Sequence, residues 1–259
     1  MLRNLVRRLP FSGNMVKLLR WVRQYVAYLN SYSKFRTQAS ERTELSVRWK
    51  DRYPCLNDNT GTTGFDRHYI FHTAWAARVL AETRPNKHTD ISSSLYFCTI
   101  ASAFVPIDFY DYRPAELHLN NLNSGAGDLV QLPFSNNSVY SLSCMHVVEH
   151  VGLGRYGDPL DANGDLKAIA ELVRVLASGG TLLFVVPVGR PRIMFNAHRI
   201  YSYEQIVAYF ADLNLVEFSL IPDNERDGGL IRNADPAMVI NQSYACGCFR
   251  FEKPVKHHV

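Results

Sequence analysis

Three aspartates stand at the ends of short apolar runs, and their chemistry suits a nucleoside. They are Asp90, Asp111 and Asp128. An ionised carboxylate accepts hydrogen bonds from both vicinal hydroxyls of a ribose, and a carboxylate oxygen can also accept from the amino group of an adenine. In an open parallel sheet, ligands bind outside the carboxyl ends of the strands. We therefore expect these three aspartates to surround one nucleoside-containing ligand.

The elements around these aspartates must bring the strand ends together. Strands that alternate with helices predict a mostly parallel sheet covered on both faces, which is a Rossmann-like α/β fold. The end of the first strand and its turn are expected in residues 88–94, and further strands in residues 95–100, 105–110, 138–144 and 181–187. The expected helices are residues 66–83, 165–177 and 203–212.

The net charge of +4 is distributed unevenly along the 259 residues. Residues 1–40 contain eight Lys and Arg and no Asp or Glu, whereas the rest of the chain contains 20 basic and 24 acidic residues. The basic character therefore belongs to one segment, and the remainder lacks the electrostatic footprint of a nucleic-acid binder. We expect no nucleic-acid partner.

The basic segment has the pattern of an amphipathic helix. Apolar residues recur on one face at helical spacing, at Met15, Leu18, Leu19, Val22, Val26 and Leu29. Such a face can pack on the domain or on a second subunit, and it can equally lie on an anionic membrane surface. We expect residues 1–63 to form this helical appendage with its linker, and residues 64–259 to form the Rossmann-like domain.

The composition favours a cytoplasmic protein, with peripheral contact at the inner membrane face as the alternative. Hydrophobic residues make up 47% of the chain, and the longest apolar runs are far shorter than a membrane span. Five scattered cysteines favour a reducing compartment over a disulfide framework. Cys246 and Cys248 form a lone C-x-C in a predicted strand, and we expect a buried pair of thiols there, with half of a metal site as the alternative.

Three segments resemble motifs of class I S-adenosylmethionine (SAM)-dependent methyltransferases. Residues 128–140, with Asp128 followed by Leu-Pro-Phe, are similar to the D-x-x-x-L-P-F-x-x-x-S-F-D segment of that superfamily. Residues 143–151, which end in Glu-His-Val, resemble its fourth strand and the residues that follow. Residues 171–187 resemble a helix, a Gly-Gly turn and the fifth strand. The similarity is greatest to a poorly characterised bacterial branch, first catalogued as a domain of unknown function and found among genes for surface-polysaccharide assembly.

This resemblance implies SAM as the cofactor and methyl transfer as the reaction. It implies that Asp111 binds the ribose, with Tyr112 beside it, and that Asp128 and the Leu129 N–H bind the adenine. The remaining cofactor residues implied by the resemblance are Asp90, Ser92, Ser93 and Met145. The superfamily's first motif usually reads D-x-G-x-G-x-G, whereas this chain has Ser92, Ser93 and Ser94 after Asp90. Because glycine adopts positive φ without cost, we expect serine there to follow a different path or to be strained.

Catalytic residues are expected just after the fourth strand. An oxygen nucleophile usually needs a general base, and histidine exchanges protons near neutral pH. The resemblance places His146 toward the sulfonium and the substrate, and Glu149 and His150 among the active-site residues. The alternative for the last two is structural, with His150 packed at a helix start and Glu149 capping it.

Two further segments are candidates for contact with a substrate. The glycine-rich loop 152–165 carries Asp158, Asp161 and Asp165, which suit sugar hydroxyls or a divalent cation, although the calcium-loop pattern is absent and we expect no metal. Asp165 can instead be a helix cap. Cationic residues follow the fifth strand, and they suit an acidic or phosphate-bearing substrate or else form a solvated loop: Arg190, Arg192, His198 and Arg199. Residues on the predicted helix 66–83, including His68, Tyr69 and His72, are expected to form a lid or simply to dock that helix.

The leading hypothesis is a SAM-dependent methyltransferase that acts on oxygen of a saccharide or a lipid-linked glycan. A domain that binds another nucleotide-type ligand is the second possibility, because the first motif is unusual. A catalytically silent Rossmann-like subunit that positions partner enzymes is the third. Nucleic-acid modification is the weakest, since only the first segment is basic.

Overall fold

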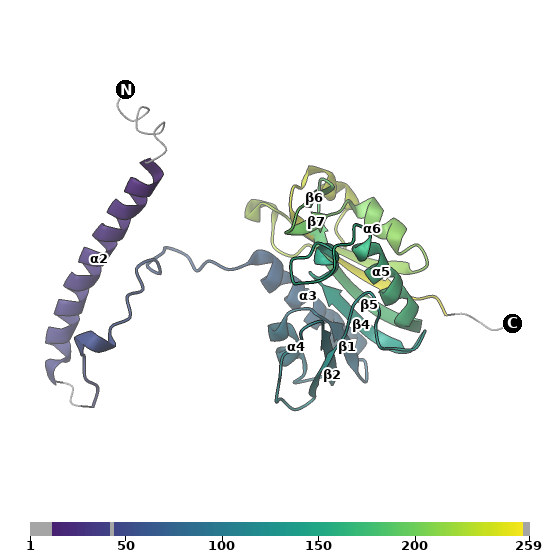
Figure 1. Ribbon diagram of the computed structural model, residues 1–259, viewed down its shortest axis with the longest axis horizontal. Coiled ribbons are helices and arrows are strands. Elements are labelled where there is room, and N and C mark those ends of the chain that lie inside the picture. Colours follow the sequence, from purple (N-terminus) through teal and green to yellow (C-terminus); the bar gives the residue numbers. More distant parts are fainter. Residues whose placement is uncertain (1–11, 42–43, 256–259) are drawn as a thin grey trace, which may run out of the picture. The chain divides into compact units, whose positions relative to one another are not determined.

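The computed structural model describes residues 12–41 and 44–255 (Figure 1). The chain divides into two compact units, and the division falls after Gly64. The first eleven residues of the basic segment lie outside the described residues.

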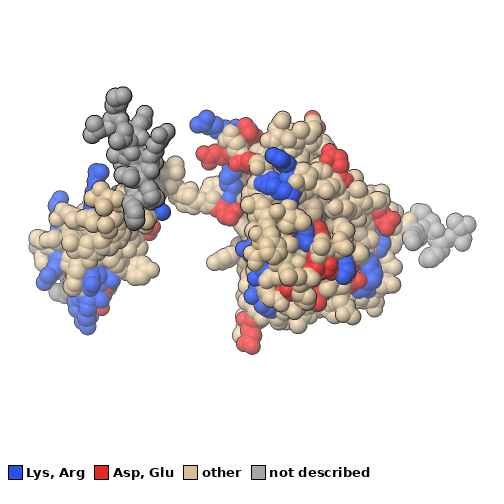
Figure 2. Space-filling view, turned by 45° about the horizontal axis from the view of Figure 1, so that its top comes forward, with Lys and Arg blue, Asp and Glu red and all other residues tan. Residues whose placement is uncertain are grey.

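The first unit consists mainly of one long helix, α2 (Ser12–Gln38), followed by the 3-10 turns η2 (Ala39–Glu41) and η3 (Trp49–Asp51). Tyr32 of the helix contacts Trp49 edge-to-face at 5.2 Å between ring centroids, which ties η3 to α2. The apolar residues of the predicted stripe are exposed: Met15, Leu18, Leu19, Val22, Val26 and Leu29. Lys and Arg side chains are spread over this unit, whereas basic and acidic residues are interspersed on the second unit (Figure 2). Among the described residues, no helix is both long and apolar enough to cross a bilayer.

The second unit is built on a seven-stranded sheet in the order β3-β2-β1-β4-β5-β9-β8. The first five strands of that order are parallel, and β9 is antiparallel to both neighbours. The strands are β1 (His88–Ile91), β2 (Ile107–Asp111), β3 (Leu122–Ala126), β4 (Val139–Met145), β5 (Leu176–Val188), β8 (Asn214–Ile221) and β9 (Ala245–Glu252). A separate hairpin pairs β6 (Arg192–Met194) with β7 (His198–Ile200). The predicted Rossmann-like α/β fold is confirmed.

Helices cover both faces of this sheet (Figure 1). They are α3 (Arg67–Thr83), α4 (Leu95–Ala101), α5 (Gly164–Val175) and α6 (Tyr203–Tyr209), with 3-10 turns η4 (Val148–His150), η5 (Glu225–Asp227) and η6 (Pro236–Asn241). Buried residues of α3 and α4 form one core cluster with Met145, Val185 and Cys246. Buried residues of α5 and α6 form the other with residues such as Phe184 and Phe249. Each cluster uses one face of the same strands, which is how alternate strand residues are buried in a covered sheet.

Residues 95–100 form a helix, so the prediction of a strand there was wrong. Phe97, Cys98 and Ala101 are buried while Tyr96 and Ile100 are exposed, which is the one-sided burial of a helix. The N–H of Cys98 donates to the Ser94 carbonyl at 3.1 Å and closes the first turn. A short apolar run has no clear periodicity, and here the tight turn after β1 leads directly into α4.

Candidate active site

The turn after β1 is held by the buried carboxylate of Asp90. Its Oδ1 accepts from the Ser93 N–H at 3.0 Å, and its Oδ2 accepts from the Ser143 hydroxyl of the neighbouring strand β4. The Ser93 hydroxyl in turn accepts from the Met145 N–H at 3.0 Å. Burial raises the pKa of Asp90 to about 6, and the hydrogen bonds from Ser143 and Ser93 oppose that rise. These contacts join β1, its turn and β4 at the position where the strand order reverses.

Ser92 has the backbone conformation that a glycine usually adopts. Its φ is +56°, in the left-handed region, and its N–H donates to the Tyr110 carbonyl at 2.8 Å. The serine turn therefore follows the positive-φ path of a glycine turn at the expense of local strain, as expected from the sequence. Strained residues of this kind gather at functional sites.

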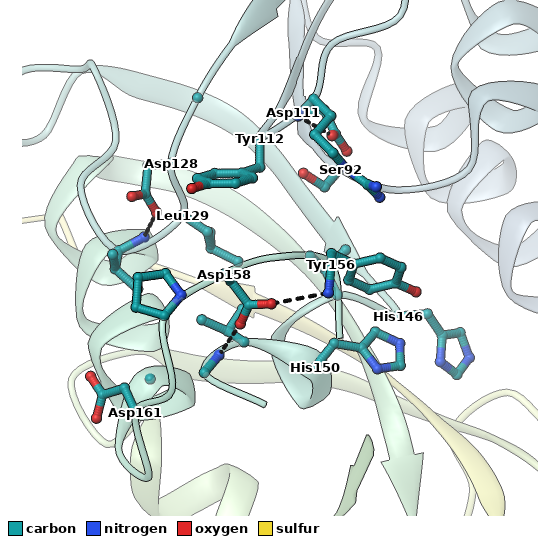
Figure 3. Close-up of a pocket in the computed structure, with 18 of the residues that line it drawn as sticks. Ser92, Asp111, Tyr112, Asp128, Leu129, His146, His150, Tyr156, Asp158 and Asp161 are labelled. Atoms are coloured by element: carbon teal, nitrogen blue, oxygen red, sulfur yellow. Dashed lines mark hydrogen bonds between the residues drawn. The ribbon is translucent and has the colours of Figure 1, made fainter. Parts of the chain in front are cut away.

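A cavity of about 360 Å³ lies at the carboxyl ends of β1, β2 and β4 (Figure 3). This volume falls within the range of roughly 300–1,000 Å³ that is typical of small-molecule sites. Seven of the predicted cofactor and catalytic residues line it: Ser92, Asp111, Tyr112, Asp128, Leu129, His146 and His150. Asp90, Ser93 and Met145 are not among its lining residues, and their hydrogen bonds shape the turn behind it.

The two cavity aspartates are fixed in direction by the backbone. Asp111 Oδ1 accepts from the Arg113 N–H at 2.7 Å, and Asp128 Oδ1 accepts from the Val130 N–H at 3.0 Å. Both carboxylates follow strands, Asp111 as the last residue of β2 and Asp128 two residues after β3. Two oriented carboxylates in one cavity can accept from a ribose and from an adenine, as the spacing of the sequence predicts.

His146 follows β4 directly and is aimed by its backbone. Its φ is +58°, and its N–H donates to the Val185 carbonyl at 2.8 Å. Its Nδ1 lies 2.9 Å from Glu149 Oε1 in the following 3-10 turn. Burial lowers the pKa of His146 to about 4, so the ring is neutral near pH 7 and Nδ1–H donates to Glu149. Glu149 thus positions His146, although the sequence predicted a direct catalytic role or a cap.

His150 presents one nitrogen to the cavity. Its Nδ1 lies 2.6 Å from the Ala197 carbonyl, which can only accept, so Nδ1 carries the proton and Nε2 carries the lone pair. Nε2 is 3.8 Å from Glu149 Oε1. Burial raises the pKa of Glu149 to about 7, and the neighbouring His150 opposes that rise. An imidazole whose Nδ1–H is held by a carbonyl and whose Nε2 carries a free lone pair has the arrangement of an oriented general base, and the Glu149 carboxyl group near Nε2 can stabilise the ring once it is protonated.

A second cavity, of about 440 Å³, adjoins the first. The two share Tyr69, His146, His150 and Tyr156, and the second is completed by residues that include His68, His198 and Tyr244. The rings of His198 and Tyr244 stack at 4.9 Å between centroids. The predicted helix at 66–83 thus contributes to this site, because Tyr69 lines both cavities. His72 and Trp75 are buried and dock the same helix on the sheet.

The glycine-rich loop forms one wall of the first cavity. Asp158 accepts from the N–H groups of Gly152, Gly154 and Tyr156, and in Figure 3 its carboxylate lies within the loop that it holds together. Asp161 pairs with Lys167 at 2.7 Å. Asp165 is buried inside the first turn of α5, where the Tyr201 hydroxyl donates to it at 2.9 Å. The three carboxylates therefore have separate structural partners and form no common cation site in the described chain.

The predicted cationic substrate residues do not act together. His198 lines the second cavity, whereas Arg190, Arg192 and Arg199 line neither. Arg199 is buried, with Nη1 donating to the Val151 carbonyl at 2.7 Å and Nε 3.5 Å from Asp165. Arg192 donates to the carbonyls of Arg190 and Ser243. Both guanidiniums stabilise backbone, so their positions give no support to a shared anion site.

Three aromatic residues of the cavities were not singled out as substrate residues from the sequence. Tyr156 lines both cavities and contacts His150 edge-to-face at 5.7 Å, and Arg113 and Arg155 approach its ring. Tyr244 precedes β9, and Tyr69 lies in the first turn of α3. The glycine-dense loop was a usable signal for Tyr156. No sequence signal pointed to Tyr244, because it reaches this edge of the sheet only through the antiparallel direction of β9.

Comparison with known proteins gives a consistent fold and no assigned activity. The family described as "Caenorhabditis protein of unknown function, DUF268" matches residues 134–223, from the loop before β4 to just after β8. No curated protein matches the chain.

Solved structures match over most of the second unit. A candidate methyltransferase of Haloferax volcanii, solved with the Trm112 methyltransferase activator, is 20% identical with a TM-score of 0.50, covering 75% of this chain and 92% of that chain. A candidate sarcosine dimethylglycine methyltransferase from Galdieria sulphuraria is 15% identical with a TM-score of 0.50, over 73% and 87% of the two chains. The [4+2]-cyclase SpnF is 13% identical with the same TM-score, over 71% and 82%. The likeness establishes the fold, and the presence of a cyclase shows that the fold by itself does not decide the reaction.

Proposed function

We propose that the second unit is a SAM-dependent methyltransferase. The observation that carries the proposal is the first cavity, in which Asp111, Asp128 and the positive-φ turn at Ser92 meet outside the carboxyl ends of β1 and β2. In this arrangement Asp111 accepts from the ribose hydroxyls, and Asp128 with the Leu129 N–H binds the adenine. Bound SAM would supply the methyl group, and His146, which lines both cavities, would lie between the cofactor and the acceptor. The fold neighbours described as methyltransferases add support.

The residues between the two cavities can deprotonate an acceptor hydroxyl. In the reaction the sulfonium S–CH₃ bond breaks and an O–CH₃ bond forms, leaving S-adenosylhomocysteine. The acceptor proton passes to His150 Nε2, and the Glu149 carboxyl group 3.8 Å away stabilises the imidazolium. Holding the acceptor and the sulfonium in line supplies much of the rate in such a displacement.

We further propose a saccharide, free or lipid-linked, as the acceptor. The second cavity combines aromatic rings with hydrogen-bonding groups, among them Tyr156, His198 and Tyr244. Hydroxyls and imidazoles can both donate to and accept from sugar hydroxyls, while the stacked rings offer an apolar surface.

Binding of SAM and S-adenosylhomocysteine by the full chain, measured by isothermal titration, tests the cofactor. We expect both ligands to bind wild type. Asp111→Ala should weaken them, whereas Asp108→Ala is the matched control, because Asp108 of the same strand pairs with Lys87 and lines neither cavity. A folded wild-type protein that gives no heat at millimolar ligand contradicts the proposal. Unchanged affinity of Asp111→Ala removes the assignment of the ribose site alone.

We propose that α2 holds the protein at an anionic membrane surface. Its apolar side chains, such as Leu18 and Leu19, are exposed within the first unit, and Lys17, Arg20 and Arg23 accompany them. Flotation with vesicles rich in anionic lipid should recover the full chain, and neither a chain without residues 1–40 nor neutral vesicles should do so. Equal flotation with and without residues 1–40 contradicts this role.

A further inference from the structure

A histidine and cysteine cluster lies beside the second cavity, and neither the cofactor site nor the general base accounts for it. His68 comes from the first turn of α3, His146 follows β4, and Cys246 belongs to β9. One ligand-type atom from each lies within 4.8 Å of those from the other two. His146 Nε2 and Cys246 Sγ are 3.4 Å apart.

These separations suit a tetrahedral zinc ion. Zn–N bonds of about 2.0–2.1 Å and Zn–S bonds of about 2.3 Å place neighbouring ligand atoms roughly 3.5 Å apart. The pair formed by His146 and Cys246 already has this spacing. The His68 ring stacks between His146 and Tyr244, at 5.4 and 5.0 Å between centroids, so its side chain must turn for its lone pair to point at the same ion. A mixed nitrogen and sulfur donor set favours Zn²⁺, whereas Mg²⁺ and Ca²⁺ prefer oxygen.

The contact from Glu149 prepares His146 to bind a metal. Because Nδ1–H donates to Glu149 Oε1, the lone pair of the ring is on Nε2, the atom that faces Cys246. Metal-bound histidines almost always donate their other N–H to a carboxylate or carbonyl in this way. The positive φ of His146 holds the ring in place at the end of the strand.

A third histidine, His72, packs against this cluster with a buried lone pair. His72 Nδ1 lies 2.6 Å from the His68 carbonyl, so Nδ1 donates and Nε2 is the acceptor. The His72 side chain is inaccessible to solvent, and its Nε2 has no hydrogen-bond partner among the described residues. Its ring meets His146 edge-on at 5.0 Å between centroids. An unpaired buried acceptor costs free energy unless an ion or a proton donor satisfies it.

We propose that His68, His146 and Cys246 bind one Zn²⁺ ion, with the fourth coordination position open to the second cavity. On binding, the Cys246 S–H bond is replaced by a Zn–S bond and the proton is released to solvent. Three protein ligands and one open position are the arrangement of catalytic rather than structural zinc sites. This proposal differs from the sequence-based expectation that the protein binds no metal. It supplies two histidine ligands for Cys246, which the C-x-C pattern alone did not reveal. Zinc binding is independent of the methyl-transfer proposal, and only a role of the ion toward an acceptor would rest on it.

Metal titration of the full-length protein tests this site without any activity assay. The protein is stripped with a chelator under reducing conditions and titrated with Zn²⁺ against a chromophoric chelator, and then with Co²⁺. We expect one zinc per chain, and a Co²⁺ spectrum with tetrahedral d–d bands and a thiolate-to-metal charge-transfer band. Cys246→Ser should abolish the charge-transfer band, and Glu149→Gln should weaken zinc affinity by about 10–100-fold.

Cys248→Ser is the matched control, because Cys248 is buried on the same face of β9, two residues away and 4.0 Å from Cys246 between the sulfurs. It should keep both the stoichiometry and the charge-transfer band. If Cys246→Ser does not fold, His68→Ala provides the test, since His68 is partly exposed and its loss removes one ligand. A folded wild-type protein that binds no zinc at micromolar concentration, or equal effects of Cys246→Ser and Cys248→Ser, would overturn the proposal.

Discussion

The two cavities meet at His146, yet they are assembled in different ways. The first is formed by successive strand ends and loops, so that Ser92, Asp111 and Asp128 follow one another in the chain as they do around the cavity. The second gathers residues from the start of α3, the end of β4, the β6–β7 hairpin and the approach to β9. The first depends on backbone geometry and carboxylates, and the second on histidines and aromatic rings. A site made of consecutive strand ends can be recognised from motifs, whereas a site made by a returning strand requires the fold.

The largest effect is expected at the boundary of the two cavities. His150→Ala should lower the rate of methyl transfer at saturating SAM by about 10²–10⁴-fold, because it removes the general base. The affinity for S-adenosylhomocysteine should change little, since Asp111 and Asp128 are untouched. Single-turnover formation of S-adenosylhomocysteine with the acceptor that wild type methylates gives the rate, and calorimetry gives the affinity. Parallel losses of rate and affinity would show that the two cavities are not separate in function.

Asp128→Ala should act on the first cavity alone. The loss of a hydrogen bond to a charged group is worth roughly 1.5–3 kcal/mol, so the affinity for SAM should fall by about 10–150-fold. Calorimetric titration of the variant beside Asp108→Ala measures the difference. An Asp128→Ala affinity equal to that of the control would place the adenine elsewhere.

The pH dependence of stability is expected to reflect His88, which lies beneath the first cavity. His88 is fully buried between Ser141 and Ser143, and burial lowers its pKa to about 3. The unfolded chain therefore binds a proton below about pH 6.5 that the folded chain does not bind until about pH 3. The free energy of unfolding therefore decreases as the pH is lowered from about 6.5 to about 3. Urea unfolding at several pH values gives the number of protons taken up on unfolding. In a folded His88→Gln variant this number should be smaller by about one between pH 6.5 and pH 3. An unchanged dependence would mean that His88 is solvated in the folded protein.

Ser92→Gly should have the smallest effect. Glycine adopts the φ of +56° without strain, so we expect a gain of up to about 1 kcal/mol, reduced by loss of the weak 3.3 Å hydrogen bond from Ser92 Oγ to the Tyr110 carbonyl. Ser94→Gly is the control, because Ser94 has an ordinary φ of −70° and gains nothing from the freedom of glycine. This change should lower the stability of the protein. Thermal denaturation compares the two. Destabilisation of Ser92→Gly equal to that of Ser94→Gly would contradict the strain assigned to this turn.

Much of the fold and half of the site could be predicted from sequence, for local reasons. The helix from Arg67 to Thr83 was predicted to within one residue, since Asp66 caps it and Arg84-Pro85 ends it. The cofactor aspartates were found because each lies at or within two residues of the end of its strand. The strand predicted at residues 95–100 failed because a short apolar run suits a helix or a strand equally well. The contact of His146 with Cys246 joins residues whose pairing depends on where β9 inserts, and the contact of Glu149 with His146 depends on the 3-10 turn that follows β4.

A crystal structure of the full-length protein with S-adenosylhomocysteine tests the central claim most directly. The account predicts the ribose hydroxyls on Asp111, the adenine amino group on Asp128, and the sulfur directed toward His146 and the second cavity. Ligand density in a different part of the molecule, or an adenosine whose ribose and base contact neither aspartate, would contradict it.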